Sequence, residues 1–163
     1  MDRVLSSLQR KTDMQIGRIL SRDFFLYLLD LEVKRARRYL NFFCILNLKL
    51  VPLPGHEDDT GLQNSLYILS RPLIEIVREC DILGSLENYQ LAVILPSADP
   101  ESSDRARLRI ESTLEYYDLK KAGYSISIDQ ICFPRDGTEI ADLISKIRGI
   151  GQSRINFQRT TFC

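Results

Sequence analysis

The stretch RECDILGSLENYQLAVILP, residues 78–96, decides the fold expected for this chain. Two short apolar runs, residues 82–86 and 89–95, flank a polar turn, and this order predicts a β-hairpin. Asn88 lies in the turn, and asparagine accepts a positive φ better than most residues, so a tight turn can form there without glycine. The hairpin is the fixed point from which the neighbouring elements are assigned.

Apolar spacing and turn residues predict the elements on either side of the hairpin. The first twenty residues are expected to be an extended or helical lead-in, and Pro72 predicts a kink or a late start in the second helix. The expected helices cover residues 21–39, 62–79, 100–119 and 140–147, and the other expected strands cover 42–51, 123–133 and, at an edge, 154–157. Helices interleaved with strands around one hairpin predict an α/β sandwich with a mixed sheet of the split-βαβ type.

Size and composition indicate one water-soluble globular domain. The chain has 163 residues, of which 44% are hydrophobic and 27% charged, ordinary values for such a domain. Lys+Arg and Asp+Glu number 22 each, so no net charge favours nucleic acid, and no apolar run is long enough to span a bilayer. Neither nucleic-acid binding nor membrane insertion is expected.

The cysteines and the single histidine give no sign of a metal centre. Cys44, Cys80, Cys132 and Cys163 are far apart and form no Cys-x-x-Cys pair, and His56 lies in a polar loop beside acidic residues. Cys44 and Cys132 sit in apolar runs, where a free thiol acts as a small hydrophobe. The sequence therefore argues against a disulfide framework and a zinc site, and favours a cytoplasmic location.

Several landmarks in order resemble the GGDEF family, the diguanylate cyclases that join two GTP molecules into cyclic di-GMP. They are the first helix RDFFLYLLDLEVKRARRY, the Arg-x-x-Asp that stands five residues before the family's GGDEF position, the strand GYSISI and the turn FPRDG. The resemblance covers nearly the whole chain, and implies a lead-in over 1–12, one GGDEF-type domain over 13–158 and a tail over 159–163. It also implies a five-stranded mixed sheet flanked by helices, the nucleotide-cyclase or ferredoxin-like sandwich.

The catalytic chemistry of the family is expected to be absent. The positions that correspond to its signature motif and metal-binding strand carry other residues: Asn47, Lys49, Glu87, Asn88, Tyr89 and Gln90. The family's glycines let the backbone approach phosphate, and its carboxylates hold magnesium. Glu87 adds bulk and negative charge, and Lys49 repels cations. We therefore expect no catalytic residues, no bound metal, no cofactor and no enzymatic activity.

A second site of the family, which binds the product, has its counterparts in place. Arg78 and Asp81 form the Arg-x-x-Asp at the family's spacing, and an ungapped count places Arg109 at the position of the site's further arginine. Arginine presents a planar fork of donors to guanine O6 and N7, and a carboxylate accepts from guanine N1–H and the amino group. The resemblance thus implies a cyclic di-GMP receptor that regulates self-association or a partner protein.

The same residues are also compatible with functions that need no cyclic di-GMP. Arg78 and Asp81 can form a surface ion pair of little energetic value, and Arg109 can be a solvated helix arginine. The chain can also be a dimerisation or docking module independent of nucleotide, with the first helix as its contact surface; the candidate residues are Phe24, Phe25, Tyr27 and Leu31, which can equally belong to the core. Residual GTP binding, or an enzyme with weak or altered cyclase chemistry, is the third alternative.

Overall fold

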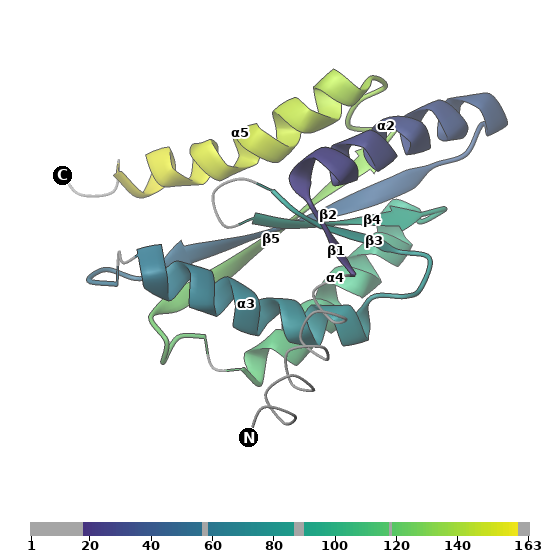
Figure 1. The fold of residues 1–163 in the computed structure, drawn as a ribbon. Helices are drawn as coiled ribbons and strands as arrows, with labels where there is room; N and C mark the ends of the chain where they lie inside the picture. The colour runs from purple at the N-terminus through teal and green to yellow at the C-terminus, as the bar shows by residue number, and fades with distance from the viewer. Residues whose placement is uncertain (1–17, 57–58, 87–89, 118, 160–163) are drawn as a thin grey trace.

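Figure 1 shows the computed structural model, which describes residues 18–56, 59–86, 90–117 and 119–159. The described elements are, in chain order, β1 (Ile19–Leu20), α2 (Arg22–Tyr39), β2 (Phe43–Pro52), α3 (Asp59–Ile76), β3 (Ile82–Ser85), β4 (Gln90–Pro96), α4 (Pro100–Glu115), β5 (Tyr124–Phe133) and α5 (Ile140–Arg159). The strands form one five-stranded sheet in the order β1-β3-β4-β2-β5. β1 runs parallel to β3, and the other pairs are antiparallel, so the expected mixed sheet flanked by helices is confirmed.

The described helices cover both faces of the sheet. Figure 1 shows α2 and α5 on one side and α3 and α4 on the other. Alternation along β2 sends its side chains to opposite faces, since Ile45 joins the core under α2 and α5 while Leu46 and Leu48 join the core under α3 and α4. β2 and β4 carry near-continuous apolar runs because both of their faces are buried.

Helix α2 reaches the sheet through one tightly packed aromatic residue. Phe25 is fully buried, and its ring lies against Gly84 of β3, where any Cβ would collide with it. Gly84 thus leaves the space that Phe25 fills, and α2 packs close to the sheet.

Two sequence predictions about the sheet edge and the last helix were wrong. The final edge strand expected over 154–157 does not form, because α5 continues from Ile140 to Arg159. Glycine costs a helix interior only about 1 kcal/mol, so Gly149 and Gly151 do not end the helix. The edge strand is instead β1, from the predicted lead-in; two residues are too few for alternation to reveal a strand. The turn expected at Glu87-Asn88 lies outside the described residues.

The helix before the hairpin begins earlier than predicted. α3 starts at Asp59 and continues through Pro72, so the late start that Pro72 suggested was wrong.

Among the described residues, none of the helices combines the length and the apolar character that a membrane span requires.

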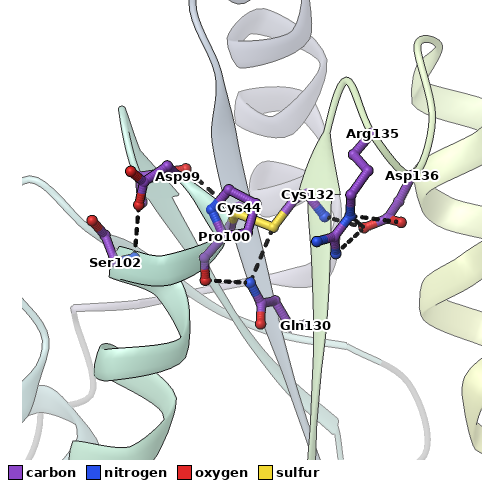
Figure 2. The surroundings of a disulfide bond; sticks show 9 residues. Cys44, Asp99, Pro100, Ser102, Gln130, Cys132, Arg135 and Asp136 are labelled. Atoms are coloured by element: carbon purple, nitrogen blue, oxygen red, sulfur yellow. Dashed lines mark hydrogen bonds and ion pairs between the residues drawn. A yellow bond between two sulfur atoms is a disulfide. The ribbon is translucent and has the colours of Figure 1, made fainter.

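The expectation that Cys44 and Cys132 are free thiols was also wrong. They face each other in the β2–β5 register and form a disulfide, with their Cα atoms 4.1 Å apart. Figure 2 shows that it lies beside the start of α4, where Gln130 Nε2 donates to Pro100 O at 2.8 Å. The expectation of a cytoplasmic location rested on unpaired cysteines, and the disulfide removes this support.

The turn after β5 is fixed next to the disulfide. The carboxylate of Asp136 accepts from the Cys132 backbone N–H at 2.7 Å and pairs with Arg135 at 2.9 Å (Figure 2). The hydrogen bond from Arg135 and the one from Cys132 lower the pKa of Asp136, although partial burial opposes them. The disulfide, this turn and the start of α4 therefore form one connected region.

Candidate ligand-binding site

A pocket of about 310 Å³ lies between the segment that follows α3 and the first turns of α4. Arg78, Asp81 and Arg109, the three residues predicted from the sequence, all line it. The remaining lining residues come from the same segment, the end of β4 and α4: Cys80, Leu95, Pro96, Ser97, Ala98, Ser102, Arg105 and Ala106. The structure thus brings together residues separated by up to 31 positions in the sequence.

Arg78 and Asp81 lie in the connection between α3 and β3. The helix predicted over 62–79 would have included Arg78, but α3 ends at Ile76. Asp81 Oδ2 accepts from the Arg78 backbone N–H at 2.8 Å, and the Asp81 N–H donates to Arg78 O at 3.0 Å. This pair of bonds closes a tight turn. Both residues are among those described, and no ion pair joins their side chains, so the surface ion pair considered from the sequence is not formed.

Helix α4 supplies the opposite wall. Asp99 caps it by accepting from the Ser102 N–H at 2.7 Å, and the hydrogen bonds from Ser102 lower the pKa of Asp99. Arg105 and Arg109 are four residues apart and therefore share the helix face that borders the pocket.

Arg105 is the lining residue that the sequence analysis did not select. Arg105 could have been predicted from the sequence, because residues four apart on a helix lie on the same face and Arg109 had already been selected. Arg105 Nη1 pairs with Glu101 at 2.8 Å, and both side chains are exposed, so this pair is weak enough for an anion to compete with it.

The guanidinium groups of Arg78 and Arg109 have donors that are not used within the described part of the protein. In the part of the chain that the structure describes, neither the Arg78 nor the Arg109 side chain has a hydrogen-bond or ion-pair partner. Both residues are exposed. Three guanidinium groups and one carboxylate around a pocket of this size suit an anionic ligand with polar ring edges.

Of the positions that the resemblance assigned to the family's active site, Asn47, Lys49 and Gln90 are described, and none of them lines the pocket. Asn47 is 1% exposed on the α2–α5 face, where its Nδ2 donates to Ile147 O at 3.2 Å and its Oδ1 has no partner among the described residues. Lys49 faces Gln90 across the β2–β4 pair. Glu87, Asn88 and Tyr89 lie outside the described residues. Within the described ranges, no group of three or more His, Cys, Asp or Glu side chains is arranged to hold a metal ion.

The pocket and the described positions Asn47, Lys49 and Gln90 are on opposite faces of the sheet. Asn47 packs on the side of α2 and α5, whereas the pocket is bordered by α4 on the other side. They are also at opposite ends of β4, since Gln90 begins this strand and Pro96, a lining residue, ends it.

Comparison with solved structures places the fold among GGDEF domains. A DGC protein from Thermotoga maritima has 20% sequence identity and a TM-score of 0.69, covering 83% of this chain and 97% of that one. The FimX GGDEF domain from Pseudomonas aeruginosa has 19% identity and a TM-score of 0.65, covering 80% and 85%. The coiled coil and GGDEF domain of DgcB from Caulobacter crescentus, in complex with c-di-GMP, has 13% identity and a TM-score of 0.55, covering 91% of each.

These similarities establish a GGDEF-like α/β fold with a five-stranded mixed sheet and, in the described part of the chain, four helices. No protein-family profile matches the sequence, and no curated protein does. The identities are low, so the likeness concerns the fold alone.

Proposed function

We propose that this protein is a cyclic di-GMP receptor without diguanylate cyclase activity, and that the ligand binds at Arg78, Asp81 and Arg109. The observation that carries this proposal is that the three residues line one pocket. Binding would regulate self-association or a protein partner, because a two-fold symmetric ligand can bridge two copies or two domains.

The free groups in the pocket match the two kinds of chemistry in the ligand. Among the described residues, the Arg78 guanidinium is unpaired and offers a fork of donors to a guanine edge. Asp81 retains Oδ1, whose one described contact is a weak 3.9 Å bond from Cys80, to accept from guanine N1–H. Arg105 and Arg109 supply positive charge for the phosphates. The fold of DgcB, which was solved in complex with c-di-GMP, supports the choice of ligand.

The absence of cyclase activity is proposed from the substituted active-site positions. Asn47 and Lys49 stand where metal-binding carboxylates are expected, and the Asn47 amide is buried and bonded to α5. An amide and a lysine are poor substitutes for the carboxylates of a two-magnesium site.

Arg78→Ala is expected to weaken cyclic di-GMP binding by about tenfold or more, because it removes hydrogen bonds from a charged donor. Isothermal titration calorimetry of the purified chain measures this, with saturable heat expected for the unmodified protein. Arg71→Ala is the matched control, since Arg71 is exposed on α3 and does not line the pocket.

Two outcomes of the titration contradict the proposal. Heat at the dilution baseline for the unmodified protein rejects the receptor function, and equal affinity in Arg78→Ala rejects the assigned site. GTP and magnesium are incubated with the same preparation, and chromatographic detection of cyclic di-GMP would show that the protein is an enzyme after all.

The exposed side of α2 favours a second candidate function, self-association without nucleotide. Of the four residues considered from the sequence, Phe25 belongs to the core. The side chains of Phe24, Tyr27 and Leu31 are 51%, 57% and 42% exposed. The Phe24 and Tyr27 rings stack with centroids 6.3 Å apart, and Leu31 extends the same stripe by one turn. A second copy that presents the same stripe would cover it in an isologous dimer.

Replacing Phe24 and Leu31 together by serine is expected to abolish any concentration-dependent dimer formed through this stripe, because it removes its apolar contact area. Sedimentation velocity over a range of concentrations measures the effect. Tyr116→Ser serves as control, since Tyr116 is 90% exposed at the end of α4. A chain that remains monomeric at every concentration, or a dimer unaffected by the double substitution, contradicts this candidate.

A further inference from the structure

The guanidinium of Arg18 binds backbone carbonyl groups at the end of α3 and at Arg78, which lines the pocket. Nη1 donates to Ile74 O at 2.9 Å, and Nη2 donates to Arg78 O at 2.6 Å and to Val77 O at 3.4 Å. These carbonyls belong to the last turn of α3 and the segment directly after it. One side chain from the start of the described chain thus holds the end of a helix and a pocket residue together.

The chemistry of this contact suits arginine. The last carbonyls of a helix have no partner within it, and a cation near them also interacts favourably with the helix dipole. No basic residue of α3 itself stands in its last turn. The planar fork of Arg18 lets two nitrogens bind separate carbonyls at once, which a lysine ammonium does with less geometric control.

Arg18 is itself held in place by the sheet. The next two residues form β1, in which Ile19 pairs with Leu83 and Leu20 with Gly84 of β3. Ile19 also packs against the core under α3 and α4. Arg18 is therefore fixed with respect to β3, the strand that Asp81 directly precedes.

Arg18 donates to Arg78 O, one end of the turn that joins the two pocket-lining residues Arg78 and Asp81. Arg78 O accepts from Arg18 and also from the Asp81 N–H, while Asp81 Oδ2 accepts from the Arg78 N–H. Loss of the Arg18 contact is expected to free one end of this turn, so that the directions of the Arg78 and Asp81 side chains vary more.

We propose that Arg18 is a positioning residue of the pocket, which fixes the turn from Arg78 to Asp81 in the conformation that binds ligand. The proposal rests on the proposed receptor function for its ligand. It extends that function by a residue that does not line the pocket.

Arg18→Ala is expected to weaken cyclic di-GMP binding about tenfold, because each hydrogen bond to a charged donor contributes on that order. Arg18→Lys is expected to restore part of the affinity. Calorimetric titration compares both variants with the unmodified protein and with Arg71→Ala. A further control, Ile131→Val, truncates the core on the α2–α5 face and lowers stability without touching the pocket.

Hydrogen exchange of backbone amides separates positioning from general stability. In Arg18→Ala without ligand, the amides of Arg78 and Asp81 are expected to exchange faster, while that of Val93 in the central strand β4 is unchanged. In Ile131→Val, the first two amides are expected to keep their protection relative to Val93.

Either of two results overturns the role of Arg18: affinity in Arg18→Ala equal to that of the unmodified protein, or unchanged exchange at Arg78 and Asp81. A loss of affinity matched by Ile131→Val also overturns it, since stability alone would then explain the effect. If the unmodified protein binds no cyclic di-GMP, the proposed function fails, and the exchange comparison alone decides whether Arg18 holds the turn.

Discussion

Phe25→Ala is expected to lower the free energy of unfolding by about 3–5 kcal/mol, the range found for large-to-small substitutions at buried aromatic positions. Phe25 lies on the side of α2 that packs on the sheet, is fully buried, and fills with its ring the space next to Gly84. The strand cannot refill this space, because Gly84 has no side chain and β3 is fixed by pairing on both edges. Urea unfolding followed by circular dichroism measures the change.

The preceding residue provides the control for Phe25. Phe24 is 51% exposed, so Phe24→Ala removes the same atoms but is expected to change the stability by less than about 1 kcal/mol. Similar losses for the two variants would contradict the packing of α2 described above.

Removal of the Cys44–Cys132 disulfide is expected to lower the free energy of unfolding by about 2–4 kcal/mol. The two residues are 88 positions apart, and a cross-link that closes such a long loop restricts the unfolded chain strongly. The variant Cys44→Ala/Cys132→Ala tests this in oxidising buffer. Cys80→Ala is the control, since Cys80 is an exposed free thiol.

A dithiol reductant gives an independent measure of the same bond. It should destabilise the unmodified protein and leave the double alanine variant unchanged. Alkylation of the denatured, unreduced protein followed by mass spectrometry should find Cys44 and Cys132 unlabelled. Labelling of both residues would show that they are thiols in solution.

The sequence predicted the centre of the fold better than its edges. The hairpin and the long apolar strands were predictable because their side-chain patterns reflect burial on both faces. β1 was not, since two residues held by backbone bonds to β3 leave no pattern. The Cys44–Cys132 pair depends on the register between β2 and β5, and distance along the sequence does not give that register.

The candidate site likewise contains residues that could be predicted from the sequence and residues that could not. Arg78, Asp81 and Arg109 were predicted from the resemblance to the GGDEF family's second site, and the structure places them around one pocket. Arg105 could have been predicted from its position four residues before Arg109 on the same helix, but it was not selected. Arg18 was not predictable, because its role depends on carbonyl groups about sixty residues away, and a carbonyl group belongs to every residue.

The pocket and Asn47 lie on opposite faces of the sheet, and this separation bears on how substitutions on one face affect the other. Substitutions around Asn47 alter packing against α5, whereas those around Arg109 alter the surface of α4. Surface substitutions on one face therefore need not change the contacts on the other, although the central strands contribute to both cores. The same separation offers protein engineers a scaffold in which carboxylates could be introduced on one side while the residues that line the pocket on the other side are left unchanged.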